Sequence, residues 1–141
     1  MRGMHPKTVA LQARTQKFAA DVIRLCDTVA KDAATQRIVS QLVDACGGTD
    51  SNYRAACRAR SKAEFIAKLG VAVEEADESK GWLQLLVASN RVAIEQTRDL
   101  IHEADELISI FVASRKTAER RKRQQDLDEK ELRSTSHRRA R

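Results

Sequence analysis

Apolar side chains recur in the first part of the chain at the spacing of an α-helix. Between Thr8 and Lys31, successive apolar positions are separated by 7, 4, 3 and 4 residues, and they are Leu11, Phe18, Val22, Leu25 and Val29. Such spacings place the five side chains on one face of a helix. Threonine caps helices well and Pro6 stands just before Thr8, so we expect the first helix to begin at Thr8.

A second apolar stripe is predicted between Ala34 and Ala59, although its middle is weak. Spacings of 4 and 3 alternate through Ile38, Leu42, Ala45, Thr49, Asn52 and Ala56. Gly47 and Gly48 fall inside this stripe, and each glycine costs a helix roughly 1 kcal/mol relative to alanine. Two outcomes are open: the helix breaks at the glycines, or close packing of its backbone on a neighbouring helix offsets the cost.

Two further helices follow. The sequence Ser61-Lys62-Ala63-Glu64 is a capping box, in which the serine hydroxyl accepts from the third helical N–H and the glutamate reaches back to the serine N–H. From there a seam continues to about Ala88 through Phe65, Leu69, Ala72, Ala76, Ser79, Leu83 and Leu86. A fourth helix, with its cap near Ser89 or Asn90, is predicted from Ile94, Thr97, Ile101, Ala104, Ile108 and Phe111.

Short connections between helices of similar length favour antiparallel neighbours, so these segments predict an all-α, up-down-up-down four-helix bundle. The third helix carries a second apolar line beside its seam, consisting of Ile66, Val73 and Trp82. A helix with two apolar stripes contacts more neighbours than one bundle supplies. We therefore expect copies of the chain to assemble into a homo-oligomer through these three residues.

Composition excludes most other architectures. The 141 residues include one Pro, five Gly and 4% aromatic residues, whereas a β-sandwich or barrel needs frequent turn residues and many β-branched or aromatic side chains. No apolar stretch is long enough to span a bilayer, and none at the N-terminus resembles a signal peptide. The cysteines, Cys26, Cys46 and Cys57, form neither a disulfide framework nor a zinc motif. We expect a cytoplasmic protein without a membrane contact.

The net charge of +6 belongs entirely to the end of the chain. From Arg115 onward eleven basic residues outnumber five acidic ones, whereas residues 1–114 hold equal numbers of each. We therefore divide the chain into a bundle, 1–114, and a basic extension, 115–141. The composition of residues 119–132 favours a continued helix, and the segment from Ser134 to the end lacks apolar anchors and is expected to be disordered.

Two groups of basic residues are candidates for contact with a phosphate backbone. Clusters of basic residues bind phosphate backbones with little dependence on the base sequence. The first lies in the extension and comprises Arg115, Lys116, Arg120, Arg121, Lys122 and Arg123. The second lies around the junction of the second and third helices and comprises Arg54, Arg58, Arg60 and Lys62, with Tyr53 beside it. The alternatives are a solubilising tail for the first group, and salt bridges to Glu64 or the acidic middle of the third helix for the second.

Catalytic chemistry finds little support. A di-metal bundle site needs two Glu-x-x-His pairs, and the chain offers only Asp99-x-x-His102. His102 is also the single histidine inside the bundle that is available as a base for a nucleophile, and no phosphate-binding glycine motif is present. We expect no catalytic residue, no metal, no cofactor and no enzyme activity.

Several motifs resemble the four-helix bundle family of 23S rRNA-intervening sequence proteins. They are Gln41-Leu42, Asn52-Tyr53-Arg54-Ala55, the stretch from Ser61 to Leu69, Glu74-Glu75-Ala76-Asp77-Glu78, Trp82-Leu83 and Glu103-Ala104-Asp105-Glu106-Leu107. The resemblance extends from Val9 to Val112 and leaves the extension outside. That family is similar to the accessory variability protein of diversity-generating retroelements, a basic homopentamer that associates with a reverse transcriptase and with nucleic acid. The resemblance thus implies a pentameric barrel and a non-enzymatic binding role.

The chain departs from the family pattern near the presumed ligand surface. Members commonly carry Arg-Ser after the Gln-Leu pair and a serine in the next turn, where this chain has Val43-Asp44-Ala45 and Gly47-Gly48. This makes the extension the stronger candidate for nucleic-acid contact. Two hypotheses follow: an oligomeric accessory protein that binds RNA or DNA, or a scaffold that binds another protein, for example a polymerase, with the extension serving solubility.

Overall fold

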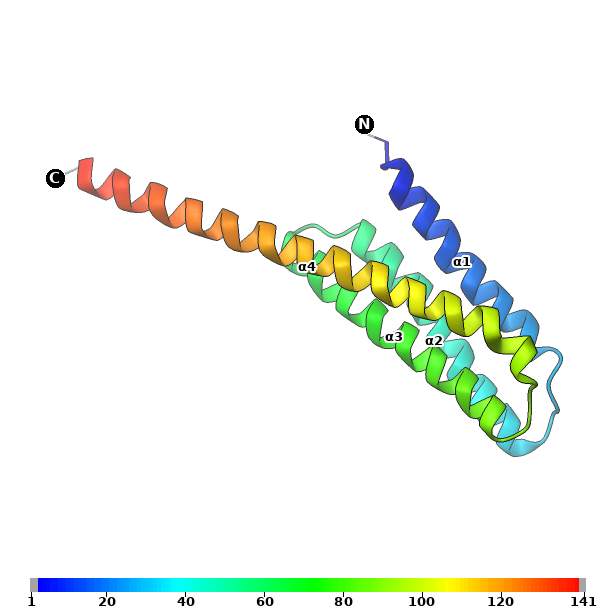
Figure 1. Cartoon of the computed structure of the whole chain (residues 1–141). Coiled ribbons are helices and arrows are strands. Elements are labelled where there is room, and N and C mark those ends of the chain that lie inside the picture. Colours follow the sequence, from blue (N-terminus) through cyan, green and yellow to red (C-terminus); the bar gives the residue numbers. More distant parts are fainter. Residues whose placement is uncertain (1–2, 140–141) are drawn as a thin grey trace.

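The computed structural model describes residues 3–139 and contains four helices with no strand in that range. The helices are α1 (Pro6–Cys26), α2 (Ala33–Cys57), α3 (Lys62–Ala88) and α4 (Ile94–Arg139). Successive helices run in opposite directions, so the predicted all-α, up-down-up-down four-helix bundle is confirmed (Figure 1). No helix in the described range is both long enough and apolar enough to cross a membrane.

The bundle has a closed end and an open end. At the closed end lie the α1–α2 loop (residues 27–32) and the α3–α4 loop (residues 89–93). At the open end lie the start of α1 and the α2–α3 turn (residues 58–61), and there α1 diverges from the other helices (Figure 1). Helix α3 packs against both α2 and α4, whereas α1 packs mainly on α2.

The core lies along the predicted seams. Its largest fully buried side chains are Phe18, Val22, Leu42, Leu69, Leu83, Leu86, Leu107 and Phe111. Tyr53 is also buried and stacks on Phe111, with ring centroids 5.3 Å apart and an interplanar angle of 21°. Stacked aromatic pairs at this separation add to the stability that burial gives. This pair fixes α2 against α4 near the open end.

The start and the end of α1 differ from the prediction. The helix begins at Pro6 and is capped by His5, whose Nδ1 accepts from the backbone N–H of Lys7 at 3.2 Å. Thr8 as the cap was therefore wrong, because proline fits the first helical position, where a backbone N–H has no helical partner. At the other end α1 stops at Cys26, and Val29 remains buried as a loop residue.

The start of α3 confirms the serine cap. The Ser61 hydroxyl accepts from the N–H of Glu64 at 3.1 Å, but the Glu64 carboxylate accepts from the N–H of Arg60, at 3.0 Å, instead of from that of Ser61. A cap of α4 at Ser89 or Asn90 was wrong. Asn90 has φ 60° and ends α3, since asparagine tolerates the left-handed region, and the helix of α4 begins only at Ile94.

Helix α2 is continuous through Gly47 and Gly48. Gly48 faces α3 closely, because a Cβ at this position would lie 2.7 Å from Oε2 of Glu75, whereas a Cβ on Gly47 would meet no atom within 4 Å. Of the two outcomes left open by the sequence, the unbroken helix with close packing is the one observed. Only Gly48 takes part in that packing.

Helix α4 projects beyond the bundle as a single helix up to Arg139 (Figure 1). The sequence led us to expect disorder from Ser134 onward, whereas the structure has helix at residues 134–139, and residues 140–141 lie outside the described range. Leu127 and Leu132 in this extension are 60% and 69% exposed. Residues 126–139 are all exposed, so this part of the extension is a helix that the bundle does not support by packing.

The second apolar line predicted on α3 is not a single line. The side chains of Ile66, Val73 and Trp82 are all half-buried. Trp82 follows Val73 by nine residues, and a rotation of about 100° per residue places it on the opposite flank of α3 from Val73. Glu75, one heptad before Trp82, faces α2 at Gly48, and Lys80, one heptad after Val73, bonds to Asp105 of α4 at 2.7 Å. Ile66 and Val73 thus lie on the α4 side and Trp82 on the α2 side. The prediction of one continuous stripe was wrong, and the oligomer itself stays a prediction.

Candidate nucleic-acid interface

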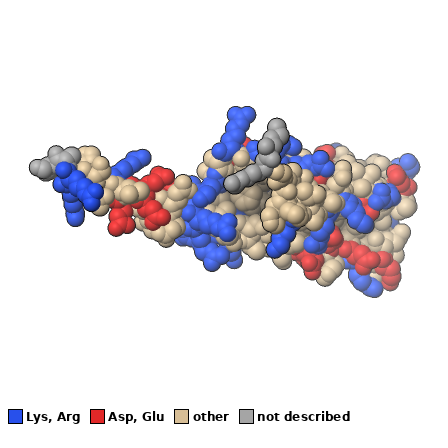
Figure 2. Space-filling model, turned by 90° about the horizontal axis from the view of Figure 1, so that it is seen from above, with Lys and Arg blue, Asp and Glu red and all other residues tan. Residues whose placement is uncertain are grey.

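The two predicted groups of basic residues meet at the open end of the bundle. Lys62, the first residue of α3, donates from Nζ to Oε1 of Gln125 at 2.8 Å. Gln125 lies just beyond the basic run of α4, so this bond places the α2–α3 turn beside that run. Figure 2 shows Lys and Arg side chains gathered where the extension leaves the bundle.

Three of the ten candidate residues are engaged by nearby carboxylates on their own helix. Arg54 contacts Asp50 (Nε–Oδ1 3.3 Å), Arg115 contacts Glu119 (Nε–Oε1 3.2 Å) and Lys122 contacts Asp126 (Nζ–Oδ2 3.1 Å). The Arg115 guanidinium also lies against α3, where a Cβ on Gly70 would be 3.3 Å from its Cζ. These side chains are less available to a ligand than their sequence positions suggested.

The charged side-chain nitrogens of the remaining seven candidates have no carboxylate within 4.0 Å in the described part of the chain. We call them the basic end surface: Arg58, Arg60, Lys62, Lys116, Arg120, Arg121 and Arg123. All seven are exposed. Salt bridging of the second group to Glu64 or to the acids of α3 was therefore wrong, because the Glu64 carboxylate is occupied by a backbone N–H and Arg54 finds its partner one turn earlier.

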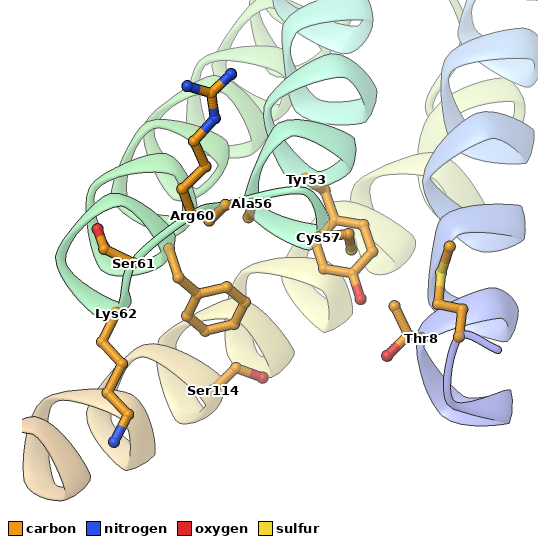
Figure 3. Close-up of a pocket in the computed structure, with 11 residues that line it drawn as sticks. Thr8, Tyr53, Ala56, Cys57, Arg60, Ser61, Lys62 and Ser114 are labelled. Carbon is orange, nitrogen blue, oxygen red and sulfur yellow. The ribbon is translucent and has the colours of Figure 1, made fainter. Parts of the chain in front are cut away.

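Adjoining cavities lie beside the basic end surface, and the sequence did not reveal them. One has a volume of about 550 Å³ and lies among α1, α2, α3 and α4, with Thr8, Tyr53, Cys57, Phe65 and Ser114 in its wall (Figure 3). A second, of about 500 Å³, lies between α3 and α4, and a third, of about 450 Å³, lies between α1 and α4. Ser114 lines all three cavities.

Tyr53 and the cysteines occupy positions that sequence reasoning misjudged or left open. Tyr53 was placed beside the arginines, but its ring turns into the bundle and its hydroxyl points toward Thr8 of α1 (Figure 3). Burial and the neighbouring Cys57 raise the pKa of Tyr53, so the phenol stays protonated and can donate. All three cysteines are free thiols, and burial raises the pKa of Cys46 to about 11.

The described residues, 3–139, contain no group of three or more His, Cys, Asp or Glu side chains that could hold a metal ion. His102 lies on α4 with Nε2 3.5 Å from Oε1 of Glu106, and its side chain is largely exposed. The arrangement at the open end is suited to binding a polyanion through cations and hydroxyl groups.

The family model for 23S rRNA-intervening sequence proteins matches residues 7–113, which is most of the bundle. The chain belongs to the 23S rRNA-intervening sequence protein family. The basic run of α4 follows the matched region, so the family match covers only the bundle side of the basic end surface. No curated protein matches the chain.

A solved structure supports the fold of this family member. The chain is similar to a Bacteroides thetaiotaomicron protein of unknown function from the S23 ribosomal protein family, whose crystal structure gives a TM-score of 0.72 at 24% sequence identity. The match covers 78% of this chain and 98% of the other. At this identity the likeness concerns the four-helix arrangement alone.

Proposed function

We propose that this protein is a non-enzymatic, homo-oligomeric accessory protein that binds the backbone of RNA or DNA through its basic end surface and extension. The single observation that carries the proposal is the contact between Lys62 and Gln125, which joins two groups of cations separated by half the chain. Seven exposed cations whose side chains have no carboxylate partner in the described residues then lie on the α2–α3 turn, at the start of α3 and on the adjoining part of α4. When unpaired cations of a protein contact phosphates, they displace the counterions condensed on the nucleic acid, and the release of these counterions favours binding.

The salt dependence of binding tests the proposal. For each phosphate neutralised, log K falls with log salt concentration by about 0.9 on duplex DNA and about 0.7 on single strands. We expect the full chain to bind a labelled polynucleotide at low salt, and the triple variant Arg120→Gln, Arg121→Gln, Arg123→Gln to bind at least tenfold more weakly with a slope smaller by about two. Removal of residues 115–141 should abolish most of the affinity.

A control variant separates this local effect from net charge. Lys31→Gln, Arg37→Gln, Arg98→Gln removes the same charge near the closed end, where these side chains are exposed. The control should keep the affinity and the salt slope of the parent. Equal losses in both variants, or no binding of any polynucleotide by the full chain at low salt, contradict the proposal.

One observation favours the scaffold as a second candidate. At the closed end a cavity of about 360 Å³ is lined almost entirely by apolar surface from Val87, Ala88, Ile94 and Ile101, and Ile94 is 51% exposed. Exposed apolar surface of this kind serves protein contacts. Co-purification from the native host with and without nuclease distinguishes the candidates, because a protein partner of the scaffold survives nuclease treatment. The pentamer and the reverse transcriptase stay predictions.

A further inference from the structure

The cavities at the open end form one connected region around Ser114. The cavity among the four helices shares Lys62, Phe65 and Ser114 with the cavity between α3 and α4, and it shares Thr8, Tyr53 and Ser114 with the cavity between α1 and α4. Each of these cavities is comparable in size to a ligand pocket, which spans about 300–1,000 Å³. The region opens directly beside the basic end surface.

We infer that this region receives an unpaired nucleobase, so that the protein binds single-stranded nucleic acid in preference to duplex. The inference rests on the proposed function and adds the ligand's strandedness to it. Stacked bases inside a duplex are not available to a pocket, whereas the bases of single strands, loops and bulges turn outward and stack on aromatic side chains. The chemistry of the cavity walls and the charge at their edge both fit such a base.

The walls offer a stacking surface and hydrogen-bonding groups. Phe65 is half-buried and lines two of the three hollows, so part of its ring is free of core contacts. Hydroxyl groups come from Thr8, Tyr53 and Ser114 on three different helices and can each donate or accept (Figure 3). A base needs both kinds of contact, because its faces are apolar and its edges carry donors and acceptors.

The cations stand where phosphates flanking an inserted base would lie. Arg60 and Lys62 line the cavity among the four helices, and Lys62 and Arg121 line the one between α3 and α4. Lys7 of α1 lines the third, together with Arg14, whose guanidinium is engaged by Glu103 of α4. This positive lining disfavours the basic extension of a second copy as the occupant, because most of its charged residues are also positive. A polyanion that presents flat apolar groups complements the region.

Filling the cavity provides the test. Ser114→Phe adds a ring to the connected region and leaves every cation in place, and Ser109→Phe is its matched control on an exposed position of the same helix. We expect Ser114→Phe in the full chain to weaken binding of a 12-nucleotide single strand by about tenfold, to leave binding of a duplex unchanged, and to keep the salt slope. The control should match the parent on both probes.

A second variant and an optical readout cover the case in which Ser114→Phe disturbs folding. Phe65→Leu keeps apolar bulk but removes the ring, and it should weaken single-strand binding with little effect on duplex. A strand that carries 2-aminopurine should change its fluorescence when bound by the parent, because the base leaves its neighbours, and should change less with either variant. Separate RNA and DNA strands show which sugar the region accepts.

The outcomes separate this inference from the proposed function. If both cavity variants keep the single-strand affinity and the 2-aminopurine signal of the parent, the base-binding inference is overturned, whereas the charge variants at Arg120, Arg121 and Arg123 still decide backbone binding. Tighter binding of duplex than of single strand by the parent also overturns it. Loss of single-strand binding alone in the cavity variants supports it.

Discussion

Lys62 and Gln125 are 63 positions apart in the chain, and the Nζ of the lysine donates to the Oε1 of the glutamine at 2.8 Å. The bond joins the first residue of α3 to the extension of α4. It has two consequences: it holds the α2–α3 turn against the root of the extension, and it keeps a lysine ammonium at the surface without a carboxylate partner in the described residues.

Substitution of Lys62 should reduce the salt dependence of binding by a single contact. Lys62→Gln removes one cation from the basic end surface, so the slope of log K against log salt should decrease by roughly one and the affinity should fall uniformly across sequences. Fluorescence anisotropy from 50 to 200 mM salt measures both quantities. Lys31→Gln at the closed end is the control. If it changes the slope as much as Lys62→Gln does, a local contact at Lys62 is excluded.

The two central glycines of α2 should respond differently to alanine. Gly47→Ala meets open space and gains helix propensity, so it should raise the free energy of unfolding by roughly 1 kcal/mol. Gly48→Ala gains the same propensity but must displace the carboxylate of Glu75, so its gain should be smaller. Thermal or urea unfolding measures the difference, and destabilisation by Gly47→Ala would contradict the exposed position that the structure gives it.

Stability should decrease at acid pH through the cap of α2. Asp32 accepts from the hydroxyl of Thr35 at 2.6 Å and from its N–H at 3.0 Å, and the guanidinium of Arg91 lies 3.6 Å away. These contacts lower the pKa of Asp32 from 3.8 to about 2. A lowered folded-state pKa gives stability that is present above the unfolded value and is lost as the pH falls from about 4 through 2.

The variant Asp32→Asn isolates this contribution. Its amide oxygen can still accept from the N–H of Thr35, but the residue no longer titrates and no longer attracts Arg91. Urea unfolding at pH 5, 3 and 2 should show a smaller loss of stability for the variant than for the parent across this range. Parallel curves for the two proteins would show that Asp32 does not supply the acid sensitivity.

Assembly makes a further prediction. Ile66 is half-buried, and the buried indole Nε1 of Trp82 has no hydrogen-bond partner among the described residues, so a second copy would complete both environments. Light scattering should give the parent a mass that is a multiple of 15.8 kDa, and Ile66→Asp or Trp82→Ala should lower it. Ala67→Asp, at an exposed neighbouring position, is the control for Ile66→Asp. A monomeric parent would contradict the predicted oligomer.

Local signals in the sequence predicted much of the fold. The serine of the capping box at Ser61 fixed the start of α3, because its partner lies three residues away, and the apolar seams identified the buried faces of all four helices. Gly47 and Gly48 were undecided from sequence because the answer depends on the space beside α3. The disorder expected from Ser134 came from composition alone, whereas the structure continues the helix of α4 there.

The candidate site was predictable only in its charges. Both basic groups were visible in the sequence, but their meeting depends on where the long α4 passes the α2–α3 turn, which no local pattern states. The pairing of Arg54 with Asp50 has the ordinary spacing of four residues and was a signal that we overlooked. The two cavities that α1 lines follow from the divergence of α1, for which the sequence offers no separate sign.

The length of α4 sets a spacing for whatever the protein touches. Its 46 residues span about 69 Å at 1.5 Å per residue, so the tip residues Arg138 and Arg139 stand about 23 Å beyond Arg123. Four carboxylates, at Asp126, Asp128, Glu129 and Glu131, outnumber two cations, Lys130 and Arg133, in the interval, so its net charge is negative and repels phosphates. Helix α4 therefore holds two positive segments at a fixed separation. A nucleic acid that contacts both segments has to bend away from the negative residues between them.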